Sequence, residues 1–494
     1  MKHGTTKISL IILALALLFS VWACSGGEDA GPTMPITTSS DKALELYKKG
    51  RDLAENVRIQ ESVEYFEKAL ELDPNFAMAH LRLCFTAPST RLFFEHFNAA
   101  KELMDKVSEA ERLWIEGVEA AVNGDPALQQ QYFEQLAALY PKDKRALNLL
   151  ANQLFGQQKY EEAIEMYEKS RALDPDYPPN YNQIGYAQRF LGNYKAAQEA
   201  LKKYIELIPD DPNPYDSYAD LLLKMGKFEK SLANFRKAVE MNSRFLPSHF
   251  GIATNLYLTG RHKEARKGLY EQYLRALNDG QRREILLATA ITYVDQEDYD
   301  LALRELNERY LLAKADEDLP TMANDLAIMA GLLIASEETD SALALYNRSM
   351  ELIEASDLTE EVKKVSRGGH LSNLAMVAWA RDDLETARAR LAEYRETISE
   401  GNVGQMQNFN GLSGLVALKA EEYQKAIDHF QQTNHRIPMF RYYLGEAYIG
   451  LGDTARGKEL IEQAAHFNSV NDLHYALIRP KAARRLEELT SAGS

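Results

Sequence analysis

The sequence has few cysteines, which could form disulfides, and few prolines, which interrupt helices. It also has no surplus of positive charge. Its 494 residues include 2 cysteines and 16 prolines, and the net charge is −16. Binding to nucleic acid phosphates needs an excess of Lys and Arg, so this balance argues against a nucleic acid partner. Hydrophobic residues make up 45% of the chain, a content that argues against disorder and suits a folded, almost entirely helical protein.

Motifs of the common enzyme classes are also missing. The sequence holds no His-Glu-x-x-His, no Gly-x-Ser-x-Gly, no phosphate-binding loop and no Cys-x-x-Cys. The histidines are scattered, and a metal site at His429 and His435 is the one alternative left open. We therefore expect a protein that is not an enzyme and that uses no cofactor or metal.

What the sequence does contain is a pattern that returns three times at a spacing of 34 residues over 145–243. Small residues recur at the two positions where a pair of helices would cross. The first helix has Ala151, Gly185 and Ala219 there, and the second helix has Ala163, Ala197 and Ser231. A large residue follows four positions later on the second helix, at Tyr167, Leu201 and Phe235. Glycines at Gly192, Gly226 and Gly260 mark the turn inside a helix pair. Each pair leaves an apolar face uncovered, so the pairs must stack.

This pattern resembles the tetratricopeptide-repeat family, which implies an all-α, right-handed superhelical solenoid. We expect about twelve helix hairpins, in a regular unit over 41–275 and a divergent unit over 276–494 that ends in a capping helix at 480–489. Inserted segments interrupt the divergent unit and predict kinks or a boundary between two halves: 278–281, 316–321, 355–367 and 399–405. Cys84 falls at a close-packed small position, where a buried thiol is expected.

The N-terminus predicts export from the cell. A basic start precedes an apolar run over 8–21, which is shorter than the roughly 20 residues that span a bilayer. Val21-Trp22-Ala23-Cys24 resembles the lipobox of bacterial lipoproteins, which implies removal of residues 1–23 and lipidation of Cys24. The alternative is cleavage after Ala23 and release into the periplasm. Ser25 after the cysteine favours, by the same resemblance, the outer membrane.

Residues 24–40 are rich in Gly, Ser, Thr and Pro and show no apolar period, so they predict a flexible tether. A lipid on Cys24 would then hold the solenoid at a membrane surface, facing the periplasm or the exterior.

In the resembled family, the first helix of each hairpin lines the inner curve of the superhelix. The resemblance places eight residues on that face as a candidate binding surface: Asn148, Asn152, Asn182, Tyr186, Arg189, Asp216, Asp220 and Lys224. Such a polar ladder could hydrogen-bond an extended peptide, and a hydrated groove without a ligand is the alternative. Asp220 stands where chaperone-binding members have Lys, which argues against a chaperone-tail ligand.

Further along the chain the same face becomes apolar, through Leu287, Ile291, Val294, Ile328, Met376, Trp379, Leu415 and Leu418. This change predicts either a groove for an amphipathic partner or a tighter closure of the superhelix. Phe93, Phe94 and Phe97 pose a similar choice between an exposed patch and burial against neighbouring helices, and burial is favoured.

Together these features predict a membrane-tethered scaffold of the bacterial cell envelope that binds a protein or peptide in its concave groove. Two other functions stay open: a glycan- or nutrient-capture lipoprotein on a helical-repeat scaffold, and a sensor or regulatory solenoid that acts with a separate effector chain. The pattern specifies a fold and leaves the partner undefined.

Overall fold

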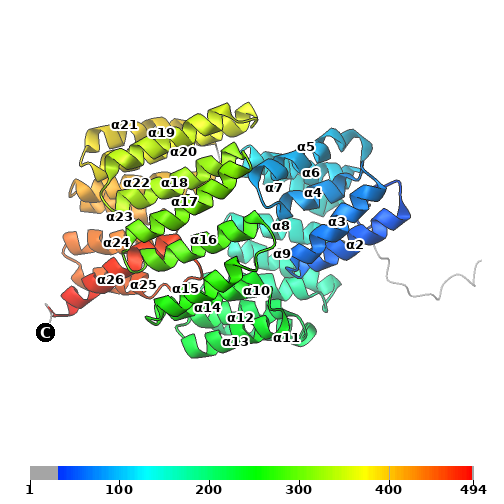
Figure 1. The fold of residues 1–494 in the computed structure, drawn as a ribbon, viewed down its shortest axis with the longest axis horizontal. Helices are drawn as coiled ribbons and strands as arrows, with labels where there is room; N and C mark the ends of the chain where they lie inside the picture. The colour runs from blue at the N-terminus through cyan, green and yellow to red at the C-terminus, as the bar shows by residue number, and fades with distance from the viewer. Residues whose placement is uncertain (1–31, 400, 435, 492–494) are drawn as a thin grey trace, which may run out of the picture.

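The computed structural model describes residues 32–399, 401–434 and 436–491. Over these ranges the chain forms 25 α-helices and one short 3-10 helix, and it contains no strand. Successive helices pair into twelve hairpins, and a last helix follows them. The predicted all-α, right-handed superhelical solenoid is therefore confirmed (Figure 1).

Seven hairpins of rather short helices come first: α2 (Asp41–Glu55) with α3 (Ile59–Leu72), α4 (Ala77–Thr86) with α5 (Thr90–Glu102), α6 (Glu109–Val122) with α7 (Pro126–Leu139), α8 (Lys144–Gly156) with α9 (Tyr160–Leu173), α10 (Pro178–Phe190) with α11 (Tyr194–Leu207), α12 (Pro212–Lys224) with α13 (Phe228–Met241), and α14 (Leu246–Leu258) with α15 (His262–Tyr273). The 3-10 helix η1 (Met104–Lys106) lies between the second and third hairpins.

Five hairpins and the closing helix follow: α16 (Asp279–Val294) with α17 (Tyr299–Ala315), α18 (Leu319–Ala335) with α19 (Thr339–Ala355), α20 (Glu360–Ala380) with α21 (Leu384–Thr397), α22 (Val403–Lys419) with α23 (Tyr423–Phe430), α24 (Pro438–Gly450) with α25 (Thr454–Ala465), and α26 (Leu473–Ser491). Helices of 17 and 21 residues, such as α17 and α20, explain why the 34-residue period loosens here. The expected insertion at 355–367 is largely the start of α20, and α26 begins well before the predicted cap at 480–489.

Small residues lie at the helix crossings as predicted, and Ala151, Ala163, Ala197 and Ala219 are fully buried. A Cβ atom on Gly185 would lie only 2.6 Å from Cγ of Leu201, so a larger residue there would separate α10 from α11. Close packing of a small residue against a large one thus fixes each hairpin.

The turn inside a hairpin requires a left-handed residue. Gly192, Gly226 and Gly260 fill this role with φ of 79°, 69° and 82°. At the corresponding turns of two later hairpins, Glu297 and Asp382 adopt φ of 60° and 64°. The later hairpins therefore keep the left-handed turn conformation although a residue other than glycine provides it.

The superhelix closes on itself, so hairpins far apart in sequence touch (Figure 1). The side chains of Thr90 and Thr321 hydrogen-bond at 2.9 Å, which joins α5 to α18. The Asn402 side chain donates to the Gly124 carbonyl at 3.0 Å, and α26 packs against α16. Contacts between successive turns therefore add to the nearest-neighbour contacts that hold an open solenoid.

The apolar stretch of the inner face serves this closure. Ile291 and Val294 are at most 1% exposed and pack in a core cluster with Ala476 of α26. Phe97 is buried, and Phe93 and Phe94 pack partly buried against the N-terminal core. Tighter closure and burial, rather than exposed apolar patches, are thus the outcome at both places.

Cys84 is buried on α4, as expected for a small apolar position. Burial raises the pKa of its thiol to about 12, so the thiolate is not populated near neutral pH. Cys24 lies outside the described residues.

Candidate functional site

The predicted inner-face residues lie on α8, α10 and α12, and the structure brings several of them together. Arg189 donates to the Asp220 carboxylate, and its guanidinium lies 5.0 Å from the ring centre of Tyr186. Asp216 accepts a hydrogen bond of 2.6 Å from Ser248 on α14. These contacts join α10, α12 and α14 along the face that carries the predicted residues.

The amides of this surface differ in their surroundings. Asn152 is exposed and accepts from the Tyr167 hydroxyl at 2.6 Å. Asn148 and Asn182 each have a buried side-chain oxygen that finds no hydrogen-bond donor among the described residues. Buried amide oxygens normally have donors, so these two positions have capacity to accept from a bound group or water.

The open groove expected along this face is partly covered. Lys224 donates to the carbonyl of Phe467, and its ammonium lies 3.2 Å from the centre of the Phe467 ring. Arg436 stacks its guanidinium 4.2 Å above the Phe190 ring. The C-terminal part of the chain therefore closes one end of the inner face, and the role of the predicted residues in binding stays a prediction.

Enclosure changes the acidity of two of these groups. Burial, aided by the charge of Asp220 and opposed by the Ser248 hydrogen bond, raises the pKa of Asp216 to about 7. Burial, with the nearby guanidinium groups of Arg189 and Arg441, lowers the pKa of Lys224 to about 7. Both groups therefore titrate near neutral pH.

A second feature of the inner side was not expected, namely an ordered segment at residues 33–39, here called the strap. The backbone N–H of Met34 donates to Asp143 at 2.8 Å. Thr37 donates to Glu111 through its N–H at 2.7 Å and through its hydroxyl at 2.6 Å. This part of the predicted flexible tether is thus docked on the solenoid.

The end of the strap is held by Asp73. Its carboxylate accepts from the Thr38 hydroxyl at 2.6 Å and from the Ser39 N–H at 2.7 Å. Burial opposes ionisation of Asp73, but these hydrogen bonds outweigh it and the pKa is lowered. Met34 and Ile36 pack against the N-terminal core. The strap therefore follows a row of three carboxylates near the starts of first helices.

Capping of helix N-termini positions two of these three carboxylates. Asp143 is the N-cap of α8, so one of its oxygens accepts from the helix and the other from the strap. Glu111 forms a capping box with Ser108 at the start of α6. Glu111 and Asp143 are thus each fixed by their own helix before they meet the strap.

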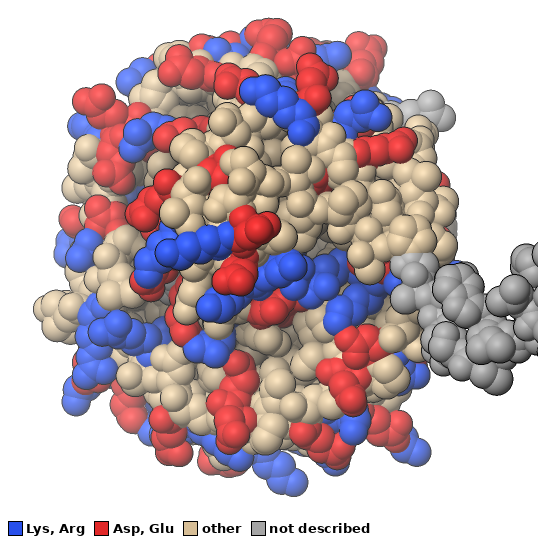
Figure 2. Space-filling view, turned by 90° about the vertical axis from the view of Figure 1, so that its right-hand side faces the viewer, with Lys and Arg blue, Asp and Glu red and all other residues tan. Residues whose placement is uncertain are grey.

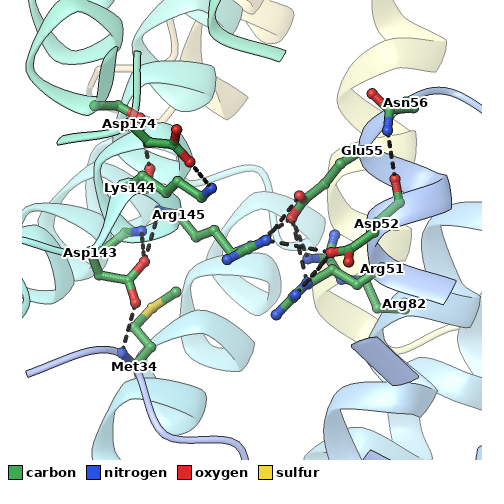
Figure 3. Close-up of polar contacts among 12 residues, drawn as sticks. Met34, Arg51, Asp52, Glu55, Asn56, Arg82, Asp143, Lys144, Arg145 and Asp174 are labelled. Atoms are coloured by element: carbon green, nitrogen blue, oxygen red, sulfur yellow. Dashed lines mark hydrogen bonds and ion pairs between the residues drawn. The ribbon is translucent and has the colours of Figure 1, made fainter. Parts of the chain in front are cut away.

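An arginine cluster lies beside the strap (Figure 3). Arg145 donates to both oxygens of Glu55, at 2.8 and 3.2 Å, and Arg51 pairs with Asp52 at 2.8 Å. Arg82 approaches Glu55 only to 4.0 Å. Three guanidinium groups therefore share two carboxylates, which leaves this side of the groove positively charged.

Arg82, in the same cluster, has a side-chain donor without a hydrogen-bond acceptor in the part of the chain that the structure describes. Its guanidinium lies 4.8 Å from the ring centre of Trp114, and its Nε is buried with no hydrogen-bond acceptor among the described residues. A cavity of about 300 Å³ is lined by Arg82, Trp114, Tyr47 and strap residues including Met34. The strap thus covers the groove without filling it.

A larger cavity of about 1570 Å³ lies where the first two hairpins face the middle of the solenoid. Its lining combines apolar side chains such as Phe85 and Leu277, which are 56% and 54% exposed, with the charged side chains of Arg58 and Glu284. The cavity exceeds the roughly 300–1,000 Å³ of most small-molecule pockets. Its size suits a segment of polypeptide.

The charged surface near the N-terminal hairpins is mixed. Figure 2 shows Lys and Arg side chains in a band across this side of the molecule, with Asp and Glu beside them. Within the described part of the chain, no group of three His, Cys, Asp or Glu side chains is placed to hold a metal ion. No helix there has the length and apolar content to cross a bilayer.

Family profiles described as tetratricopeptide repeat match residues 46–76, 144–210, 219–281 and 368–393. With the twelve stacked hairpins, these matches define a helical-repeat protein with the architecture of a protein-interaction scaffold. The chain therefore contains tetratricopeptide repeats, in its N-terminal hairpins and again in α20 and α21.

Among curated proteins, the mouse (Mus musculus) mitochondrial import receptor subunit TOM70 is 25% identical over 184 residues, which are 37% of this chain. The match spans only 26% of that receptor's length. The TPR repeat-containing protein YpiA of Bacillus subtilis is 20% identical over 365 residues, 71% of this chain and 78% of YpiA.

Among solved structures, the Cut9–Hcn1 hetero-tetramer of the APC/C covers 85% of this chain and 76% of its own, with a TM-score of 0.37 and 16% identity. YrrB, a TPR protein with an unusual peptide-binding site, covers 36% of this chain and 91% of its own, with a TM-score of 0.26 and 20% identity.

Proposed function

We propose that this protein is a lipid-anchored scaffold of a bacterial cell envelope that holds a partner protein inside its solenoid. The cavity of about 1570 Å³ is the observation that carries the proposal. Tetratricopeptide solenoids bury their apolar faces between hairpins, and large apolar side chains left more than half exposed together, such as Phe85 and Leu277, are typical of interaction sites.

The lining of this cavity supports a polypeptide as the ligand. Phe85 and Leu277 offer apolar contacts, while Arg58, which pairs with Glu61, and the neighbouring Arg275 offer hydrogen bonds to a backbone or an acidic side chain. A mixed lining of this kind matches the apolar centre and polar rim of protein interfaces.

The N-terminal sequence supports the location. A lipid on Cys24 would be separated from Thr33, where the strap begins, by residues 25–32. Nine peptide steps span at most about 30 Å, so a lipidated chain would keep the first hairpins close to the bilayer. Anchoring of this kind requires more than one acyl chain, as lipoprotein processing would supply.

The partner is tested by crosslinking in living cells. A photoreactive amino acid at Phe85 or Leu277 should crosslink the same protein, and the matched control at Leu451, which is 51% exposed and lies outside the cavity lining, should not. Mass spectrometry identifies the product. Equal yields at Leu451 and Leu277 would rule out the cavity as the binding site.

The anchor and the polar ladder are tested separately. Labelled palmitate should enter the wild-type protein and not the Cys24→Ser variant, and absence of label in both would remove the anchor from the proposal. Loss of the crosslinked partner in the Asn152→Ala, Asp220→Ala pair would extend the binding surface to the inner face of α8 and α12.

A further inference from the structure

The strap is attached to the solenoid in an unusual way. Among the described residues, its hydrogen bonds to the repeats go to the side-chain carboxylates of Asp73, Glu111 and Asp143, and no backbone–backbone hydrogen bond joins residues 33–39 to a helix. A carboxylate accepts an N–H from any residue except proline. This row can therefore hold an extended chain of varied sequence.

The strap also fits its groove loosely. Thr33, Pro35, Thr37 and Ser39 are exposed, and Met34 and Ile36 are only partly buried. A cavity of about 300 Å³ remains between the strap and the first helices of the repeats. Arg82 is among the residues that line this cavity. The groove thus has room that the strap does not use.

We propose that the groove under the strap is a binding site for an extended segment of a partner protein, and that residues 33–39 occupy this site in cis until the partner displaces them. The strap defines the chemistry of that segment. It carries two apolar side chains two residues apart, like Met34 and Ile36, followed by hydroxyl residues like Thr37 and Thr38.

The geometry favours a different protein over a second copy of this chain. Ser40 is the N-cap of α2, so the strap passes directly into the first helix. No linker is left between them that would carry the strap of one molecule to the groove of another. Exchange of the strap between two copies of this chain would require α2 to unwind. Binding of a partner segment requires only that the strap leave the groove.

Covalent connection explains why the groove is closed at rest. Because the strap continues directly into α2, it stays beside the groove at a high effective concentration, so a free segment must bind more tightly than the strap or find it released. A partner that engages the larger cavity at the same time would meet this condition. The inference goes beyond the proposed function, and it can be tested without a membrane or a known partner.

The test uses the full-length protein in detergent and a synthetic peptide of residues 32–40 with a photoreactive methionine analogue at position 34. In the released variant, Ile36→Ser with Thr37→Pro, the strap loses an apolar contact, a hydroxyl and the N–H that reaches Glu111. The matched control is Pro35→Ser, at an exposed position that donates no hydrogen bond.

We expect the released variant to crosslink the peptide at least tenfold more than wild type or Pro35→Ser, with products on α6 or α8. Adding Asp73→Asn and Asp143→Asn should return the yield to the wild-type value, since each amide presents an N–H₂ where the strap needs an acceptor. Equal crosslinking of wild-type and released protein would overturn the proposal, as would insensitivity to the two Asn substitutions.

A second measurement needs no variant. In wild-type protein, millimolar peptide should increase hydrogen exchange at the N–H groups of Met34, Thr37 and Ser39, which the strap uses for docking. Unchanged exchange at these three groups would also overturn the proposal.

Discussion

The first and last segments that the structure describes, residues 33–39 and α26, are both held against the solenoid, but by opposite means. The strap is half exposed and hydrogen-bonds to carboxylates at the rim of the N-terminal groove. At the other end, Arg479 of α26 donates to both oxygens of Asp295, at 2.6 and 2.5 Å, and the Asp295 side chain is fully buried. We call this second contact the C-terminal seal.

The difference predicts how each contact behaves. A buried carboxylate that loses its partners keeps the full desolvation penalty, so a buried ion pair resists partial opening. Hydrogen bonds at a half-exposed site are replaced by water when they break, and each adds only about 0.5–1.5 kcal/mol. The C-terminal seal therefore fixes the closed superhelix, while the strap is the part that can open.

The largest expected effect is at the seal. Asp295→Ala leaves the guanidinium of Arg479 without its bidentate partner and removes a hydrogen bond of 2.8 Å to His262. We expect a loss of about 3–5 kcal/mol in urea unfolding, as for other broken buried pairs. The matched control is Glu297→Gln, at the exposed pair with Arg484, with an expected loss below about 1 kcal/mol.

Similar losses for Asp295→Ala and Glu297→Gln would break the comparison, because burial would then make no difference to the contact. Asn at position 295 gives an intermediate case, since its single oxygen can still accept from Arg479. Its loss should lie between those of the Ala variant and the control.

The next effect concerns helix crossings, which both regions share. A Cβ on Gly445 would lie 2.8 Å from the backbone carbonyl oxygen of Gly457, which cannot rotate away. A Cβ on Gly50 would meet the Phe66 ring at 2.9 Å, and a ring can shift slightly. We expect Gly445→Ala to lose about 1–3 kcal/mol and Gly50→Ala to lose less.

Thermal unfolding measures these losses, and Gly156→Ala is the control because no atom lies within 4 Å of its added Cβ. If Gly50→Ala proved the more damaging, the Phe66 ring would yield less than the fixed carbonyl of Gly457, contrary to this expectation.

The repeat register was predictable because small and large side chains at fixed spacing report directly on helix crossings. Ala151, Gly185 and Ala219 are all buried at these crossings. In the later hairpins this signal weakens for a physical reason. Residues such as Glu297 and Asp382 replace the turn glycine in the same left-handed conformation, and longer helices change the period.

The apolar inner face indicated tighter closure as one of two outcomes, but the choice between them and the strap were beyond a reading of single repeats. Closure depends on how small rotations between hairpins accumulate, and no local pattern reports that sum. The carboxylates of Glu111 and Asp143 cap the starts of α6 and α8, so their presence in the sequence does not indicate a second role in binding the strap. The composition of residues 33–39 is typical of a linker, because three of its N–H groups bind through the backbone and leave no side-chain signature.

A third effect lies within the covered inner face and depends on pH. The pKa of Asp216 is raised from 3.8 to about 7 in the folded protein, so between these values the folded chain binds more protons than the unfolded chain. Stability should therefore fall as pH rises through this window. Asp216→Asn keeps an acceptor for Ser248 and removes the titration.

Urea unfolding at pH 5 and pH 7 measures this effect. We expect wild type to lose on the order of 1–2 kcal/mol more than Asp216→Asn between the two pH values. Asp174→Asn, at a more exposed ion pair with Lys144, serves as the control and should follow wild type. Identical pH profiles for Asp216→Asn and wild type would mean that this part of the inner face is open to water.

The smallest expected effect on global stability is at the strap, and it sharpens the comparison most. Asp73→Asn should cost about 0.5–1.5 kcal/mol, because the amide can replace only part of what the carboxylate accepts from Thr38 and Ser39. Hydrogen exchange at the Ser39 N–H should nevertheless rise severalfold, while exchange within α26 stays unchanged.

The lowered pKa of Asp73 means that docking of the strap persists above the ordinary carboxyl pKa of 3.8 and is lost as pH falls through the lowered pKa. Faster exchange at both ends of the chain in Asp73→Asn would show that strap and seal open together, and the strap would then be part of the closed superhelix rather than its movable cover.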